Sequence, residues 1–374
     1  MKTGETYSRV VIKLGTSTLT DGGTELSLAR MVDLVQQINA VKSGGVQVLL
    51  VSSGGIAAGR EGMAYPDLPH YLPAKQMLAA IGQPRLMAIY TQLFTLYRQE
   101  IAQVLLTRDD LADRRRYLNA RNTLEALLAY DVVPIINEND TIATEEIRFG
   151  DNDNLSALIA NVMEADLLLL LTDQDGVFTA DPRTHPEAQR VERIETDQIP
   201  DEILAAARDS GNGLGTGGMI SKLSAAELAR RSGAAVVVAS GATTGVIPRI
   251  VLQKEPLGTY FSPLGTHMES RKRFLLAGMD EAAGQLMIDP GAAQALRQGG
   301  SLLPVGITHV TGMFTRGQSV TVTDSSGKPV AVGLSNYSAD DVRQILGQHS
   351  DQIDTILGYA YGAEVIHHNN LVLL

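Results

Sequence analysis

The stretch GDNDNLSALIANVMEADLLLLLTD, residues 150–173, combines a polar turn, a helical pattern and a buried strand. Its apolar residues recur at the spacing of an amphipathic helix, at Leu155, Leu158, Ile159, Val162 and Met163. The leucines at 167–171 are typical of a strand that is buried on both faces. Asp153 or Asn154 is the predicted N-cap. One capping side chain is enough for a helix, so the other Asp and Asn residues predict a second role for this turn.

Other apolar runs of the same kind alternate with helical patterns along the chain. The predicted strands are 9–15, 46–52, 102–107, 132–136, 166–172 and 234–240. The predicted helices between them include 27–42, 73–99, 117–129 and 221–232. Buried strands that are separated by helices predict an α/β fold around a mainly parallel sheet with right-handed crossovers.

The pattern changes after about residue 265. The charged segment MESRKRF, 268–274, is a candidate linker. Beyond it lie short strand-like runs separated by glycine-rich turns: GQLMID, GITHVTG, GQSVTVTD, KPVAVGLS and AEVIHH. SADD, 338–341, predicts a capping box at the start of a short helix. We therefore predict a first domain over 1–265, a linker over 266–279 and a small β-rich barrel over 280–374.

Composition excludes several classes of function. The chain has 374 residues, no cysteine and a net charge of −11, so disulfides and thiolate chemistry are excluded. An acidic surface disfavours sequence-independent binding of nucleic acid. Residues 280–374 carry four Lys and Arg against nine Asp and Glu, which also makes RNA an unlikely partner of the tail. No run approaches the roughly 20 apolar residues of a membrane span, so we expect a cytoplasmic protein without a membrane partner.

Small and polar residues follow the predicted strands where an open parallel sheet binds its ligands. Lys13 and Gly15 follow the first strand, and Ser53 follows the second. The run 137–140, NEND, follows the fourth strand, and 172–173, TD, follows the fifth. Glycine and hydroxyl residues at such positions let anions approach backbone N–H groups, which predicts a phosphate site.

A glycine-rich segment, SGNGLGTGGMISK, covers residues 210–222. It contains the spacing G-x-G-x-x-G, but no strand directly precedes it, so a plain flexible loop and a phosphate-binding loop are both open readings. Lys222, at the start of the next helix, opposes the helix dipole and favours an anion nearby. Lys13 could be a snorkelling lysine at the end of a sheet, or it could reach the same phosphate group. Two lysines around one phosphate cluster suit phosphoryl transfer.

Seven motifs together resemble the glutamate 5-kinases of the amino-acid kinase family, and the tail resembles a PUA domain. The motifs are VIKLGTSTLT, SSGGIAAGR, NARNTLEALL, PIINEND, GDNDNLSAL, LLTDQDGVFTADPR and GLGTGGMISK. The similarity covers essentially the whole chain, and one departure is Gly55, where the family usually has alanine. The resemblance implies a three-layer α/β sandwich followed by a PUA-like domain.

The resemblance also implies roles for individual residues. Lys13 and Lys222 would contact the transferring phosphate, and Asp153 would hold both lysines in place. Three residues would bind glutamate: Ser53, Asp140 and Asn152. The residues implied for ATP are Lys13, Thr172, Asp173, Thr216, Gly217, Gly218, Met219, Ile220, Ser221 and Lys222.

The implied reaction is the ATP-dependent phosphorylation of the γ-carboxylate of L-glutamate, the first step of proline biosynthesis. Mg²⁺ would accompany ATP, and no residues are assigned to a metal, because nucleotide-bound Mg²⁺ usually keeps water and phosphate ligands. Proline as feedback inhibitor, a glutamyl phosphate reductase as partner and a homo-oligomer are implied as well. Two alternatives remain open: a related kinase acting on aspartate, acetylglutamate, carbamate or a nucleotide, and RNA binding by the tail.

Overall fold

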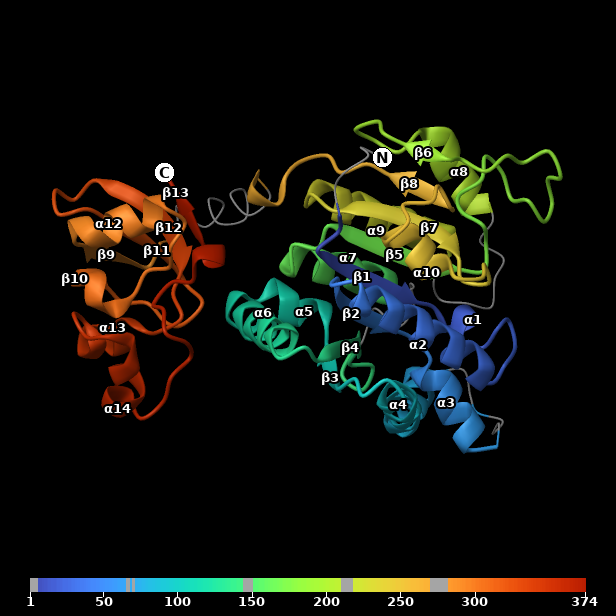
Figure 1. Cartoon of the computed structure of the whole chain (residues 1–374), viewed down its shortest axis with the longest axis horizontal. Helices are drawn as coiled ribbons and strands as arrows, with labels where there is room; N and C mark the ends of the chain where they lie inside the picture. The colour runs from blue at the N-terminus through green and yellow to red at the C-terminus, as the bar shows by residue number, and fades with distance from the viewer. Residues whose placement is uncertain (1–5, 65–67, 69–70, 144–150, 210–217, 270–281) are drawn as a thin grey trace. The chain divides into compact units, whose positions relative to one another are not determined.

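The computed structural model describes residues 6–64, 68, 71–143, 151–209, 218–269 and 282–374. The chain divides into two compact units, Met1–Leu111 with Arg121–His267, and Ala112–Ala120 with Met268–Leu374. Each unit has its own sheet and its own hydrophobic core (Figure 1). Most of the predicted linker, 266–279, lies outside the described residues, so the predicted domain boundaries stay a prediction.

An eight-stranded sheet forms the centre of the first unit, in the order β3-β4-β2-β1-β5-β7-β8-β6 (Figure 1). Its strands are β1 (Arg9–Leu14), β2 (Gln47–Ser52), β3 (Ile101–Leu106), β4 (Val133–Glu138), β5 (Leu167–Thr172), β6 (Arg193–Ile194), β7 (Ala235–Ser240) and β8 (Thr259–Phe261). All neighbouring pairs are parallel except β7 and β8. The predicted α/β class with a mainly parallel sheet is therefore confirmed.

Helices cover both faces of this sheet. They are α1 (Thr16–Leu19), α2 (Leu28–Ser43), α3 (Gly55–Gly62), α4 (Leu72–Thr95), α5 (Arg108–Ala112), α6 (Arg114–Ala129), α7 (Asp151–Val162), α8 (Asp201–Asp209), α9 (Met219–Arg231) and α10 (Val246–Val251). Ile12 and Leu14 of β1 belong to the core that includes residues of α2, α4 and α10. Successive side chains of a strand point to opposite faces, so Lys13 points to the other layer, where α7 packs on β1 and against α9.

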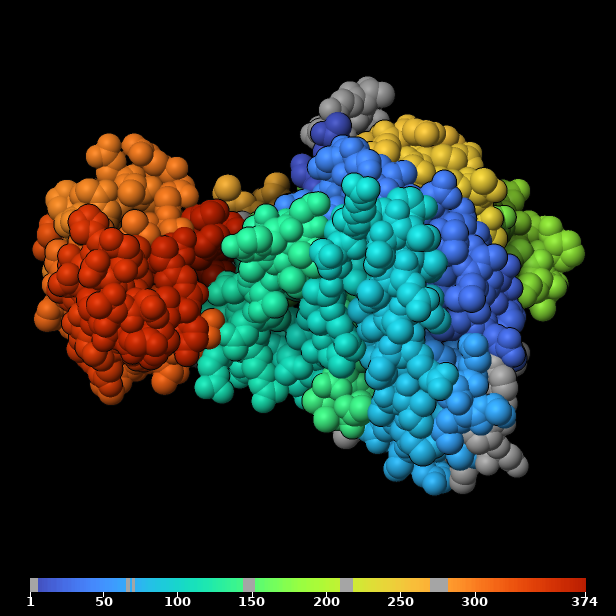
Figure 2. All heavy atoms as spheres, turned by 60° about the horizontal axis from the view of Figure 1, so that its bottom comes forward, coloured from blue at the N-terminus to red at the C-terminus, as the bar shows by residue number. Residues whose placement is uncertain are grey.

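Helices α3 and α4 pack unusually closely. A Cβ atom on Gly82 of α4 would lie 1.8 Å from the carbonyl oxygen of Gly55 in α3, so this contact requires glycine. Figure 2 shows α4, in cyan, along the face turned to the reader.

Two predicted boundaries near the polar motifs were wrong. Strand β4 extends to Glu138, so Asn137 and Glu138 are part of the strand. Helix α7 begins at Asp151, so neither Asp153 nor Asn154 is its N-cap. The side chain of Asp153 contacts Lys13 of β1 and Ser221 of α9 instead of capping its own helix. Its place in the first turn of α7 is still favourable, because an acidic residue there complements the helix dipole.

The second unit contains a five-stranded sheet in the order β10-β9-β11-β12-β13. Its elements are β9 (Gly284–Ile288), α12 (Pro290–Arg297), β10 (Ile307–Gly312), β11 (Ser319–Thr323), β12 (Pro329–Leu334), α13 (Ala339–Ile345), α14 (Ile353–Leu357) and β13 (Leu371–Leu373). The predicted capping box is confirmed, with Ser338 and Asp341 bonded reciprocally. The predicted strand AEVIHH is wrong: Ile366 makes only an isolated bridge, and His367 caps a short turn before β13.

Candidate active site

Three charged side chains from three separate elements meet in the first unit. Lys13 of β1 places its Nζ 2.7 Å from Oδ1 of Asp153, and Lys222 of α9 places its Nζ 3.3 Å from Oδ2 of the same carboxylate. All three are buried, and Asp153 has no exposed surface. Asp153 was predicted to hold Lys13 and Lys222 in place, and both lysines contact its carboxylate.

Burial and neighbouring charges shift the pKa values of Asp153 and Lys13. Burial by itself would raise the pKa of Asp153, but the charges of Lys13 and Lys222, with hydrogen bonds from Lys13 and Ser221, lower this pKa to about 2. Burial lowers the pKa of Lys13, and the repulsion from Lys222 adds to this effect, although the carboxylate opposes it. Two lysine amines thus share one carboxylate, and amines clustered in this way favour the binding of an anion.

Glycine and serine residues surround the lysines. The Oγ of Ser221 lies 2.7 Å from Oδ2 of Asp153 and 2.7 Å from the carbonyl oxygen of Gly218. A Cβ atom on Gly15 would lie 3.3 Å from Nζ of Lys13, so glycine leaves room for the amine. Gly218 is the N-cap of α9 and has no side chain to cap its first amides. Uncapped amides at a helix N-terminus are suitable donors to phosphate oxygens.

The residues predicted to bind the amino-acid substrate form a second cluster. Nδ2 of Asn152 donates to Oγ of Ser53 over 2.9 Å and to Oδ1 of Asn137 over 2.9 Å. Oδ1 of Asn152 accepts from the backbone N–H of Glu138 over 3.3 Å. Asn152 and Asp153 are neighbours in the first turn of α7, so this turn joins the two clusters.

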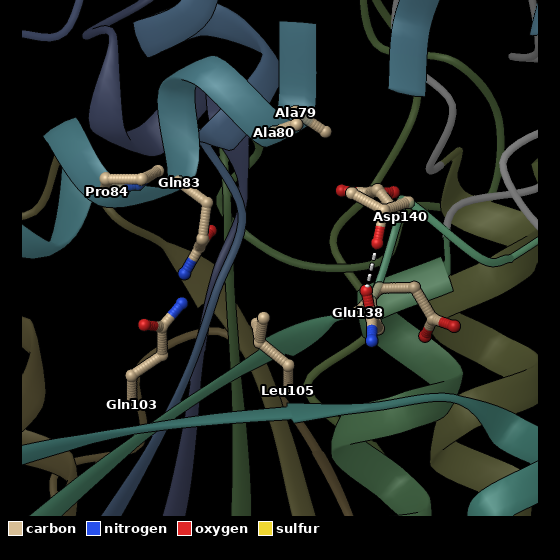
Figure 3. A pocket seen from close by; sticks show the side chains of 10 residues that line it. Ala79, Ala80, Gln83, Pro84, Gln103, Leu105, Glu138 and Asp140 are labelled. Carbon is tan, nitrogen blue, oxygen red and sulfur yellow. Dashed lines mark hydrogen bonds between the residues drawn. The ribbon is translucent and has the colours of Figure 1, made fainter. Parts of the chain in front are cut away.

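Among the described residues, Asp140 makes no hydrogen bond to Ser53 or Asn152. It lines a groove of about 220 Å³ between α4 and β3, together with Gln83, Gln103 and Glu138 (Figure 3). Burial raises the pKa of Asp140 to about 6. A carboxylate in such a groove is suited to an ammonium group of a ligand.

The residues predicted to bind ATP are only partly described. Thr172, at the end of β5, donates its hydroxyl to Oδ1 of Asp173 over 2.9 Å. Gly218 is the N-cap of α9, and the predicted residues from Met219 to Lys222 form its first turn. Thr216 and Gly217 lie outside the described residues.

Two polar residues of the site had no predicted role. Asn137 was recognised only as part of the NEND motif, and Gln83 was not singled out at all. Nδ2 of Asn137 donates to Oε1 of Gln83 over 2.8 Å, and both side chains are buried. A glutamine in an otherwise apolar helical pattern is a weak signal, and only the contact with Asn137 connects Gln83 to the site.

Comparisons with known proteins place the chain in a family. The model of the amino acid kinase family matches residues 8–240, and the PUA domain model matches residues 284–357. The chain is 50% identical over 369 residues to a protein of Shewanella pealeana named glutamate 5-kinase, covering 98% of each chain. The chain belongs to the amino acid kinase family and groups with its glutamate 5-kinases. A glutamate 5-kinase of Vibrio campbellii is 51% identical over 366 residues, covering 98% of this kinase and 96% of that protein.

Among solved structures, this kinase is similar to the UMP kinase of Bacillus anthracis, with 19% identity and a TM-score of 0.48. That similarity covers 70% of this kinase and 98% of the UMP kinase chain.

Within the described residues, no group of three or more His, Asp or Glu side chains is arranged to hold a metal ion. No described helix combines the length and the apolar character of a membrane span.

Proposed function

We propose that this kinase transfers the γ-phosphoryl group of ATP to the γ-carboxylate of L-glutamate, forming ADP and L-glutamyl 5-phosphate. The identity of about half of all residues to glutamate 5-kinases over nearly the whole chain supports the choice of substrate. The observation that carries the chemistry is the contact of Lys13 and Lys222 with the single carboxylate of Asp153.

The reaction needs charge neutralisation more than proton transfer. The γ-carboxylate of glutamate has a pKa of about 4.3 and is ionised at neutral pH, so it needs no general base. One of its oxygens attacks the γ-phosphorus while the bond to the leaving ADP oxygen breaks. The obstacle is the repulsion between a carboxylate and a triphosphate. Mg²⁺ that enters with ATP would offset part of it, and the buried lysines would offset the rest.

In this mechanism Lys13 and Lys222 contact the oxygens of the transferring phosphate. Asp153 holds both ammonium groups at one point, and its low pKa keeps it ionised throughout the neutral range. Ser53, Asn152 and Asp140 are the proposed ligands of glutamate. Thr172, Asp173 and the first turn of α9 are the proposed contacts of ATP.

The proposal extends to partners. Glutamyl phosphate is an acyl phosphate that hydrolyses readily, so a glutamyl phosphate reductase would receive it for proline biosynthesis. We also propose a homo-oligomer in the cytoplasm, with proline as an inhibitor that competes at the glutamate site.

The test is a coupled assay of ADP release with glutamate, aspartate, acetylglutamate and UMP, each with and without proline. Hydroxylamine in parallel reactions would trap an acyl phosphate as a hydroxamate. We expect ADP release and hydroxamate with glutamate alone, and less of both with proline. Faster turnover of another acceptor would make the protein a different amino acid kinase.

A further inference from the structure

A row of hydrogen bonds joins four polar side chains from four parts of the first unit. Asn137 of β4 donates to Gln83 of α4 over 2.8 Å, and Asn152 of α7 donates to Asn137 over 2.9 Å. Asn152 also donates to Ser53, which follows β2, over 2.9 Å. The row begins at Gln83, a buried residue of α4, and ends at Asn152 and Ser53, two proposed ligands of glutamate.

Gln83 and the backbone N–H of Glu138 together set the direction of the row. An amide side chain has a donor end and an acceptor end, and Nδ2 of Asn137 faces the Oε1 acceptor of Gln83. The Oδ1 end of Asn137 therefore faces Asn152, where it accepts a hydrogen bond, and it also accepts one from the backbone N–H of Glu138. Without the acceptor of Gln83, a rotated Asn137 would place its NH₂ group against the NH₂ group of Asn152.

The direction of the row determines which groups of Asn152 and Ser53 remain available to a substrate. Both protons of Asn152 Nδ2 are donated, to Asn137 and to Ser53, and Oδ1 of Asn152 accepts from the backbone of Glu138. Because Oγ of Ser53 accepts from Asn152, its own proton is directed elsewhere and can serve a carboxylate of the substrate.

Close packing holds Gln83 in position. The neighbouring Gly82 is in contact with the carbonyl oxygen of Gly55, and a Cβ atom on Gly55 would lie 3.2 Å from Oε1 of Gln83. The Nε2 atom of Gln83 is buried and has no hydrogen-bond partner among the described residues. Figure 3 shows Gln83 directed from α4 into the groove towards Gln103. Packing against Gly55 therefore restricts Gln83 independently of Asn137 and keeps its Oε1 atom 2.8 Å from Nδ2 of Asn137.

We propose that Gln83 is a positioning residue for the amino-acid substrate. Its carbonyl oxygen sets the orientation of Asn137, and through Asn137 the orientation of Asn152 and Ser53. The inference rests on the proposed function, because Asn152 and Ser53 are its proposed glutamate ligands.

The test compares three variants by their steady-state kinetics. Gln83→Met keeps the length of the side chain and removes the acceptor, so we expect the KM for glutamate to rise about tenfold, with kcat and the KM for ATP within about twofold of wild type. Gln83→Glu keeps an oxygen acceptor and should bring the KM for glutamate back to within about threefold of wild type. Gln47→Met is the matched control, because it removes a side-chain acceptor for Nε of Arg9 at the opposite end of β2 from Ser53, and it should change neither KM.

An unchanged KM for glutamate in Gln83→Met would overturn the proposal. Equal rises of the KM for glutamate and the KM for ATP in Gln83→Met would also overturn the proposal, because they would indicate that Gln83 serves packing only. The same conclusion would follow if the KM for glutamate rose as much in Gln83→Glu as in Gln83→Met. If Gln83→Met does not fold, as judged by circular dichroism, Gln83→Asn replaces it, because its amide is too short to reach Asn137. Wild-type protein is assayed first. If it does not turn over glutamate, both the proposed function and this inference are wrong. If it does, the variants test the role of Gln83 separately.

Discussion

Nζ of Lys13 and Oδ1 of Asp153 lie 2.7 Å apart, although one belongs to the central strand β1 and the other to the first turn of α7. The other oxygen of Asp153 faces Lys222 of α9. One carboxylate thus holds two lysine amines close together. Clustered amines suit a site in which a triphosphate and a carboxylate have to approach each other.

Replacing Lys222 by alanine should reduce kcat by at least about 10²-fold, because one charge contact to the transition state is lost. The fold should be retained, since Lys13 still pairs with Asp153. The measurement is kcat from the ADP-release assay, with circular dichroism as the check on folding. Arg231→Ala, an exposed change in the same helix, is the control and should turn over normally. Normal kcat in Lys222→Ala would remove this lysine from the mechanism.

Replacing Asn152 by alanine should raise the KM for glutamate about tenfold or more, and far more than the KM for ATP. Its amide donates to Ser53 and Asn137 on the substrate side, whereas ATP is proposed to bind at the start of α9. Both KM values come from titrating each substrate at a saturating level of the other. Parallel changes in the two values would indicate a general folding defect instead.

Replacing Asp153 by asparagine should lower the free energy of unfolding by about 3–5 kcal/mol at pH 7, because two buried ammonium groups lose their shared counter-charge. Urea denaturation measures this difference. Arg231→Ala, which removes the exposed partner of the i,i+4 pair with Glu227, is a suitable control and should cost no more than about 1 kcal/mol.

The contribution of Asp153 to stability should depend on pH, and Asp153→Asn can be used to measure this dependence. The pKa of Asp153 is about 2 in the folded state against about 3.9 in an unfolded chain, so its contribution to stability is complete above about pH 5 and is lost progressively as the pH falls towards 2. The stability difference between wild type and Asp153→Asn should therefore narrow between pH 5 and about pH 3. A constant difference over that range would mean that Asp153 is not the titrating group.

The groove residue Asp140 predicts a pH dependence of the reaction. Burial raises its pKa to about 6, so it is mostly neutral at pH 5 and mostly ionised at pH 7. If its carboxylate binds the ammonium group of glutamate, kcat/KM for glutamate at saturating ATP should rise about tenfold over this range. The γ-carboxylate of glutamate is already ionised there and adds little. Asp140→Asn should give a low and flat profile, and a wild-type slope in this variant would exclude Asp140 as the cause.

The local sequence pattern was enough to predict the buried strands and the position of a phosphate site. The leucine run 167–171 and the runs like it predicted buried parallel strands, because apolar residues without alternation indicate burial on both faces. The motifs around Lys13, Asp153 and Lys222 predicted a phosphate site at the ends of those strands. The predicted start of α7 was wrong, because capping preferences describe local bonds and Asp153 makes its bonds to distant elements.

Only the tertiary structure decided how these residues pair. Strand order places β1 beside β5, and the packing of α7 against α9 brings Asp153 between two lysines that the sequence separates widely. The link from Gln83 to Asn152 has no counterpart in sequence periodicity, because it depends on two helices approaching closely at Gly55 and Gly82. Periodicity shows which face of an element is buried, whereas contacts between elements depend on the direction and distance at which those faces meet.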